Sequence, residues 1–104
     1  MATTATDAHE STARAPFAAR MVAAATASFG GLDAVVNNAA ILTTPAPVGE
    51  TSADVWRDVL DVNVVGTANV IRHALPVLES GGGGLIVNLS STWGRSTAPG
   101  VAPY

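Results

Sequence analysis

Two short apolar segments enclose one long helical pattern, and this order constrains the fold more than any other feature of the sequence. The apolar segments are residues 32–37 and 85–89, and the helical pattern covers residues 52–79 between them. A strand, a helix and a second strand in this order form a right-handed crossover, which makes the two strands parallel. The sequence therefore predicts an α/β fold that contains part of a doubly wound parallel sheet.

The long helical pattern has a recognisable start and end. Residues 51–54 (Thr-Ser-Ala-Asp) resemble a capping box, and Pro76 together with the glycines at 81–84 ends the pattern. Apolar side chains cover an arc of roughly 240° on this helix, which is wider than the ~100° stripe of a surface helix. One sheet face cannot cover that arc, so we expect a second partner, which is either another subunit or missing chain. We predict a homo-oligomer of the full-length form through helix 52–79.

The sequence before the first strand divides into a lead-in and a helix. Residues 1–15 are small and polar and lack periodicity, so we expect a loose lead-in. Pro16 suits the first turn of a helix, and Gly30 with Gly31 suits its end, which predicts a helix over residues 16–29. Residues 16–104 are then expected to form one partial domain, in which this helix precedes a single strand-helix-strand unit.

Polar side chains follow both predicted strands. Asn37 and Asn38 end the first strand, and Ser90 and Ser91 follow the second. Because the carboxyl ends of parallel strands share one edge of the sheet, these residues converge there. Ligands of open α/β sheets bind at that edge, which makes it the candidate functional site.

A tyrosine follows the serines after a loop rich in glycine and proline. A hydroxyl such as that of Ser91 and the phenol of Tyr104 can donate two hydrogen bonds to one carbonyl oxygen, or exchange a proton with it. Carbonyl or alcohol chemistry is therefore a candidate function. Trp93 and Arg95 in the same loop either line a substrate pocket or pack within the loop.

Composition argues against several other functions. The net charge is −3 and the five basic residues are scattered, so the sequence offers no stripe for nucleic acid or an anionic membrane. No apolar run reaches the ~18 residues that a membrane span requires. The sequence has no cysteine, which leaves no disulfide framework and favours a cytoplasmic location. His9 and His73 show no ligand-like spacing, and we expect no metal site.

Short sequence blocks occur in a fixed order along the chain. They are Asn-Asn-Ala-Ala at 37–40, Asp-Val-Asn at 61–63, the serine pair at 90–91, and Tyr104 after Pro-Gly at 99–100. Over roughly residues 29–104 the chain resembles the short-chain dehydrogenase/reductase (SDR) family. The resemblance implies a partial Rossmann-like fold, NAD or NADP as the cofactor, and a small carbonyl or alcohol substrate.

The resemblance also implies catalytic roles for particular residues. Tyr104 matches the family tyrosine that protonates the substrate carbonyl as hydride arrives, or takes the alcohol proton in reverse. Ser91 matches the serine that orients the substrate oxygen, and Ser90 matches its less critical neighbour. Asn63 matches an asparagine that distorts its helix and holds a water linked to the family's lysine. The alternative for Asn63 is a core asparagine with a satisfied amide.

The same resemblance concerns the cofactor. Asn37, Ala39 and Ala40 match the Asn-Asn-Ala-Gly block that passes close to the cofactor, although Ala40 replaces the usual glycine. Asp7 is a candidate counterpart of the aspartate that holds the adenine. The family's Gly-x-x-x-Gly-x-Gly turn and the lysine four residues after the tyrosine do not occur in this sequence. We therefore expect a truncated, inactive fragment that binds NAD or NADP weakly.

Two functions remain open at this point. The first is an NAD(P)-dependent oxidoreductase that interconverts ketones and secondary alcohols by hydride transfer, here present as a fragment. The second is a non-catalytic, SDR-derived remnant that serves as an interaction module. An unrelated doubly wound binding domain would require all the blocks to coincide by chance.

Overall fold

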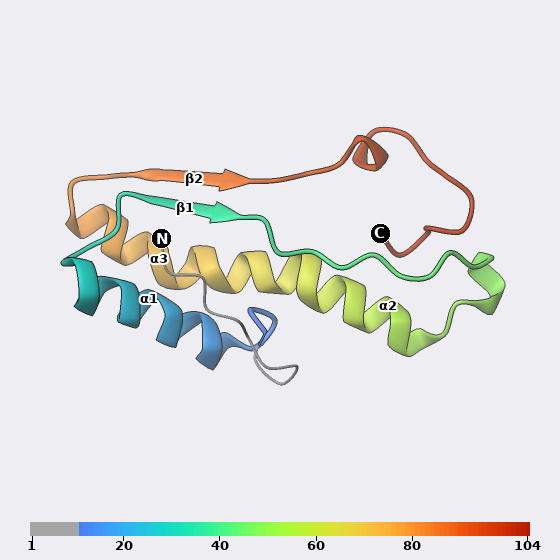
Figure 1. Cartoon of the computed structure of the whole chain (residues 1–104), viewed down its shortest axis with the longest axis horizontal. Helices are drawn as coiled ribbons and strands as arrows, with labels where there is room; N and C mark the ends of the chain where they lie inside the picture. Colours follow the sequence, from blue (N-terminus) through green and yellow to red (C-terminus); the bar gives the residue numbers. More distant parts are fainter. Residues whose placement is uncertain (1–10) are drawn as a thin grey trace.

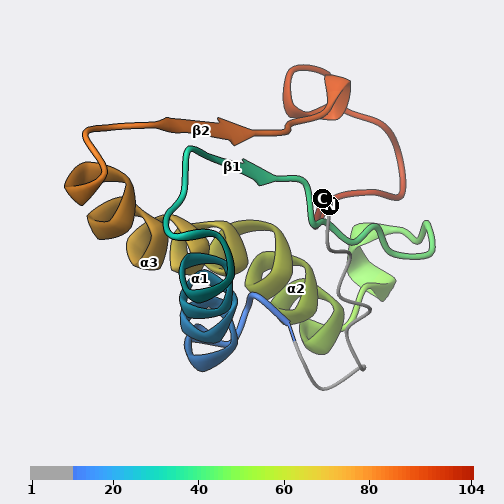
Figure 2. The ribbon, with the colours of Figure 1, turned by 60° about the vertical axis from the view of Figure 1, so that its left-hand side comes forward.

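The computed structural model describes residues 11–104, which form a short parallel sheet with helices beneath it (Figures 1 and 2). The strands are β1 (Ala34–Asn37) and β2 (Leu85–Asn88), and the helices are α1 (Ala15–Phe29), α2 (Ala53–Leu60) and α3 (Thr67–Ser80). Asp7 and His9 lie outside the described residues. The observed order of elements is the helix followed by a strand-helix-strand unit that the sequence predicts.

The two strands are parallel neighbours, as predicted from their connection. Asn37 lies opposite Asn88, and the ladder continues past both ends of the strands. At one end the Leu85 N–H donates to the Asp33 carbonyl, and at the other the Leu89 N–H donates to the Asn37 carbonyl, both at 3.0 Å. The strand β1 is shorter than the predicted segment 32–37 because β2 begins only opposite Ala34.

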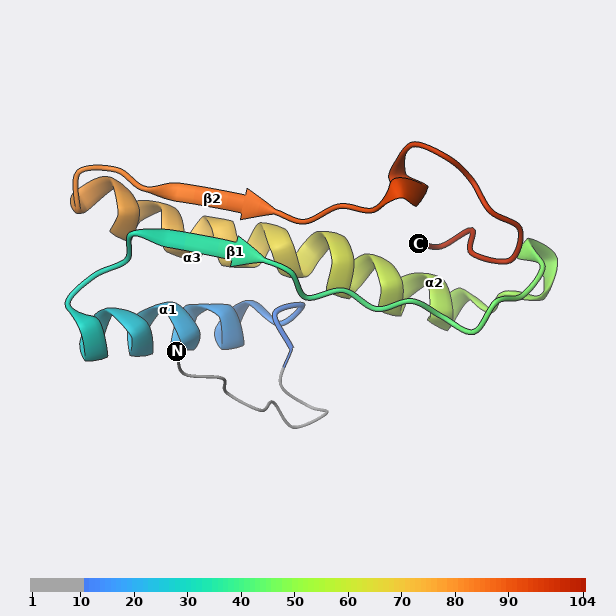
Figure 3. The same ribbon diagram turned by 45° about the horizontal axis from the view of Figure 1, so that its top comes forward.

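The helix α1 packs against α3, and much of the small core lies between them (Figure 3). Pro16 lies in the first turn of α1, and Gly30 ends the helix in the left-handed conformation with φ 84°. That conformation lets the Gly30 N–H donate to the Thr26 carbonyl at 2.8 Å. The buried apolar residues are Phe17, Ala18, Val59, Val70, Ala74, Leu78 and Val101.

Residues 11–14 form a turn that contacts α3. The Asn69 amide nitrogen donates to the carbonyls of Thr12 and Ala13, both at 3.1 Å. Gly66 makes room for this turn, because a Cβ there would lie 2.6 Å from the Thr12 hydroxyl oxygen. This part of the predicted lead-in is therefore held against the helix by hydrogen bonds, and α1 begins at Ala15 directly after it.

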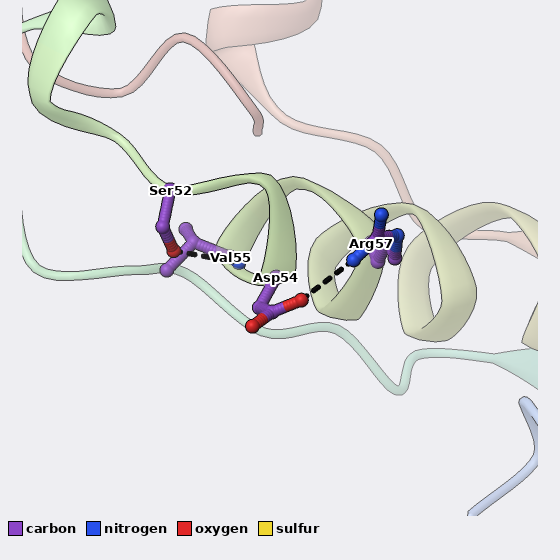
Figure 4. A network of polar contacts seen from close by, with 4 residues as sticks. All are labelled: Ser52, Asp54, Val55 and Arg57. Atoms are coloured by element: carbon purple, nitrogen blue, oxygen red, sulfur yellow. Dashed lines mark hydrogen bonds and ion pairs between the residues drawn. The ribbon is translucent and has the colours of Figure 1, made fainter.

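The predicted long helix begins with a side-chain cap. The Ser52 hydroxyl oxygen accepts the Val55 N–H at 3.3 Å, which satisfies one of the free donors of the first turn (Figure 4). Arg57 pairs with Asp54 one turn away at 2.6 Å. Both side chains of that pair are exposed, so the ion pair adds little to stability.

The same helix continues through α2, a π-helical segment over Asp61–Gly66, and α3. The sequence predicts its end through Pro76 and the following glycines, but Pro76 lies inside α3 and the helix ends at Ser80. Only the glycines end the helix, and the Gly81 and Gly83 N–H groups donate back to the carbonyls of its last turn. None of the helices within residues 11–104 has the length and apolar character needed to cross a membrane.

Gly84 lies where the chain turns from α3 into β2. A Cβ at this position would lie 2.8 Å from the Asp33 carbonyl oxygen and 2.6 Å from the end of the Leu78 side chain. The Asp33 carbonyl accepts the Leu85 N–H, so it cannot move without loosening the ladder. The start of β2 therefore requires glycine.

Gly84→Ala should lower the free energy of unfolding by about 1–3 kcal/mol, because an added methyl group overpacks this contact. Gly31→Ala is the matched control, since a Cβ there meets nothing within 4 Å and its φ is not positive. Urea denaturation of both variants measures the difference. Equal stability of Gly84→Ala and the wild type would show that the strand end has room for a side chain.

Candidate active site

Within residues 11–104, the six residues proposed from the sequence as catalytic or cofactor-binding line one cavity of about 200 Å³. The cavity lies beyond the carboxyl ends of β1 and β2, where Figure 3 shows the chain ending at Tyr104. These residues are Asn37, Ala39, Ala40, Asn63, Ser91 and Tyr104, and they are joined by Val64, Thr67, Leu89, Ser90 and Gly94. Residues far apart in the sequence thus share one site.

Two asparagine side chains, one from each strand, bond to each other at the end of the sheet beside the cavity. The Asn37 amide nitrogen donates to the Asn88 side-chain oxygen at 2.8 Å. The parallel register places these two residues directly opposite each other at the last position of both strands. The bond lies at the last paired position of the two strands, and Ala39 and Ser90, two residues further along each chain segment, line the cavity.

The helix is π-helical over Asp61–Gly66, and this segment carries Asn63. The Asn63 side-chain oxygen accepts the Ile41 N–H at 2.8 Å, and its amide nitrogen donates to the Ile41 carbonyl at 3.0 Å. Single-turn π-helical segments occur often at functional sites. Both polar atoms of the Asn63 amide group have hydrogen-bond partners, as the core-asparagine alternative requires. These partners belong to the loop after β1, and Asn63 lines the cavity.

Asn63 therefore connects the long helix to the loop that leaves β1. Its main-chain carbonyl accepts the Thr67 hydroxyl at 3.2 Å, one turn further along. Thr67 also lines the cavity, although it belongs to none of the four sequence blocks. The i, i+4 spacing from Asn63 is the signal that identifies it, because side chains at that spacing share one helix face.

Both serines after β2 face the cavity, but they make different contacts. The Ser91 hydroxyl oxygen accepts the Trp93 N–H at 3.2 Å and so caps a single helical turn over Thr92–Gly94. This bond occupies a lone pair and leaves the hydroxyl hydrogen able to donate. The Ser90 hydroxyl lies against Gly94, where a Cβ would approach it to 3.2 Å.

The loop that carries Tyr104 is bonded to the segment after β1 and contains a turn of its own. The Ala46 N–H donates to the Gly100 carbonyl at 3.0 Å, and the Tyr104 N–H donates to the Val101 carbonyl at 3.0 Å. Gly100 has a positive φ of 83°, which suits glycine at this turn. These bonds return the chain to the sheet edge and place the phenol at the cavity.

Trp93 packs edge-on against Tyr104, with ring centroids 5.9 Å apart and planes at 90°. Of the two alternatives for this loop, the structure shows packing for Trp93. Of residues 93–95, Gly94 lines the cavity, and Trp93 and Arg95 do not.

Among the described residues, the side chains that line the cavity include no Asp, Glu, Lys, Arg or His. Its hydrogen-bonding side chains are amides, hydroxyls and one phenol, and the rest of the lining is apolar: Ala39, Ala40, Val64 and Leu89. Such a lining does not favour a phosphate or a metal ion over a neutral ligand. It suits a small neutral molecule that accepts hydrogen bonds, such as a carbonyl compound.

Comparison with known proteins identifies the family. A model of the short chain dehydrogenase family matches residues 5–104. The chain belongs to this family. The cavity is thus lined by residues from the sequence blocks that the chain shares with its family.

Curated SDR relatives align with much of this chain but with a smaller part of their own length. The NADPH-dependent pterin aldehyde reductase of Arabidopsis thaliana is 47% identical over 72 residues, which cover 69% of this chain and 30% of the relative. Dehydrogenase/reductase SDR family member 4 of Homo sapiens is 36% identical over 85 residues, which cover 82% of this chain and 31% of the relative. The chain thus spans about a third of the length of these relatives.

Solved structures support the predicted fold. ElxO with NADP bound is 28% identical and has a TM-score of 0.83, over 89% of this chain and 38% of its own. A variant of ElxO with NADPH bound has a TM-score of 0.82 at 27% identity, and the match covers 88% of this chain and 37% of the ElxO chain. The predicted α/β class, with part of a doubly wound Rossmann-like sheet, is confirmed.

Asn63→Leu should lower the free energy of unfolding by about 1–3 kcal/mol, because it removes two hydrogen bonds to Ile41. The Ile41 amide should also exchange its hydrogen faster, which hydrogen-exchange mass spectrometry measures. Asn38→Ala, in the same loop, is the control and should leave both quantities nearly unchanged. Unaltered exchange at Ile41 in Asn63→Leu would contradict the role of this contact.

Proposed function

We propose that this SDR chain supplies the carbonyl-binding part of an NAD(P)-dependent oxidoreductase that interconverts ketones and secondary alcohols by hydride transfer. The observation that carries the proposal is that Ser91 and Tyr104 line the same cavity. Two hydroxyl donors at one cavity can bind a single carbonyl oxygen. The coverage of about a third of each relative supports a longer enzyme, of which these residues form one part.

We propose NAD or NADP as the cofactor of that enzyme, which supplies or accepts the hydride when it is bound. Asn37, Ala39 and Ala40 lie at the carboxyl end of β1, where the small alanine side chains leave the backbone exposed beside the cavity. This surface fits a flat ring that lies close to the backbone. The sequence contains no Gly-x-x-x-Gly-x-Gly turn, so these residues account for only part of the cofactor site.

In this proposal the residues of the chain bind the substrate oxygen and move its proton. The Ser91 hydroxyl donates a hydrogen bond to the carbonyl oxygen while its own oxygen is fixed by the Trp93 N–H. The phenol of Tyr104 gives its proton to that oxygen as negative charge develops there, and takes it back from the alcohol in the reverse direction. Asn63 holds the loop after β1 in place beside both groups.

A second candidate function is a non-catalytic interaction module derived from the same family. Exposed apolar side chains along the long helix favour an interface, namely Leu60, Val64, Val65 and Leu75. The same side chains support a homo-oligomer of the active enzyme, formed through residues 52–79. We propose the homo-oligomer as part of the enzyme, and a cytoplasmic location that accords with the lack of cysteine in the sequence.

Ser91→Ala and Tyr104→Phe in the longer enzyme should each lower kcat by about 10²-fold or more, because each removes a positioned donor to the substrate oxygen. Ser90→Ala is the matched control and should cost far less, because Ser91 and not Ser90 matches the family serine that orients the substrate oxygen, and the Ser90 hydroxyl lies against Gly94. Steady-state kinetics measure the three variants, and circular dichroism checks their folding. An inactive Ser90→Ala enzyme together with an active Ser91→Ala enzyme would show that the assignment of Ser91 to the substrate oxygen is wrong.

The 104-residue chain alone is the negative control for these kinetics. It should bind NAD or NADP only very weakly and show no turnover, since the sequence lacks the Gly-rich turn and the lysine that follows the family tyrosine. Micromolar affinity in a calorimetric titration would overturn this expectation. An inactive longer enzyme that still forms an oligomer would favour the interaction module.

Leu75→Glu should convert the proposed oligomer into smaller species, because it places a charge at one of the exposed apolar positions of helix 52–79. Leu75 has an exposed fraction of 42% in the isolated chain. Phe29→Glu, on the exposed end of α1, is the matched control and should leave the oligomer intact. Sedimentation velocity measures both, and an unchanged Leu75→Glu oligomer would place the interface elsewhere.

A further inference from the structure

We propose that Trp93 is a positioning residue that holds the Tyr104 ring in place at the cavity, an inference that rests on the proposed function. Trp93 is not among the described residues that line the cavity, so it acts through Tyr104 and not on the substrate. The two rings meet edge to face at 5.9 Å and 90°. This geometry is the one that aromatic quadrupoles favour.

The Trp93 side chain extends from a turn that is held by several hydrogen bonds. Ser91 caps that turn through its hydroxyl oxygen, and the Gly94 N–H donates to the Ser91 carbonyl at 3.0 Å. The Arg95 and Ser96 N–H groups both donate to the Thr92 carbonyl at 3.0 Å. A well-bonded turn gives Trp93 a fixed place from which to contact a neighbour.

Tyr104 needs such a contact because its ring is not enclosed by the core. Its exposed fraction is 41%, and its main-chain N–H is held by the Val101 carbonyl in a short turn. The backbone turn restrains the Cα but leaves the side-chain torsions free to rotate. The contact with the Trp93 ring restricts those rotations.

The turn therefore couples the two proposed catalytic hydroxyls. Ser91 sits at its start and contacts the Trp93 main chain, while the Trp93 side chain contacts Tyr104. A change in the turn moves both groups relative to the cavity. Small displacements of reacting groups reduce turnover strongly, and they affect kcat more than ground-state binding.

The first test is spectroscopic and needs neither cofactor nor turnover. The sequence contains one tyrosine, so every tyrosine ring signal in an NMR spectrum of this chain belongs to Tyr104. Trp93→Ala should shift these signals, because the ring current of the indole is lost. Trp56→Phe, which alters the aromatic side chain on α2, is the matched control and should leave them in place. Unmoved Tyr104 signals in Trp93→Ala would overturn the inference.

The second test is kinetic and uses the longer enzyme. Trp93→Ala should lower kcat about tenfold while KM for the carbonyl substrate changes less than about twofold. Trp93→Phe should recover most of the lost kcat, since a phenyl ring can also meet Tyr104 edge to face. A Trp93→Ala enzyme with wild-type kcat, or with a loss confined to KM, would overturn the inference.

The two tests separate this inference from the proposed function. If the Tyr104 signals move but the wild-type enzyme turns over no carbonyl substrate, the proposed function fails and the positioning role fails with it, while the ring contact itself stands. If the wild-type enzyme is active and neither the signals nor kcat respond to Trp93→Ala, the inference fails alone.

Discussion

Parallel pairing of β1 with β2 is the constraint on which the candidate site depends. The pairing ends at Asn37 and Asn88, whose side chains bond to each other at 2.8 Å. Because both strands point the same way, the residues that follow them leave the sheet together. An antiparallel pairing of the same segments would place the Asn-Asn-Ala-Ala block and the serine pair at opposite ends of the sheet.

The long helix contributes a second constraint through its π-helical segment. Asn63 extends from that segment and binds both main-chain polar groups of Ile41, which fixes the course of the loop after β1. The helix thus does more than connect the strands, because it also holds one wall of the cavity. Its Thr67 lies one turn further along the same wall.

The sequence carries enough information to predict the fold class and the convergence of the site, because periodicity and strand order decide both. It does not predict the amide pair of Asn37 with Asn88, since that bond depends on a register which hydrophobic pattern alone does not specify. Pro76 misleads because a proline inside a helix removes one main-chain hydrogen bond without necessarily ending the helix, and α3 continues to Ser80. The contact of Trp93 with Tyr104 depends on the course of a loop, for which local sequence gives little guidance.

The central claim is that Ser91 and Tyr104 bind one carbonyl oxygen at the edge of the sheet. A crystal structure of the longer enzyme with NADP and an unreactive carbonyl analogue tests it most directly. The account predicts that the analogue's oxygen lies within hydrogen-bond distance, about 2.5–3.0 Å, of both the Ser91 and the Tyr104 hydroxyl oxygens. An ordered analogue whose oxygen contacts neither hydroxyl, in a protein that is active, would contradict it.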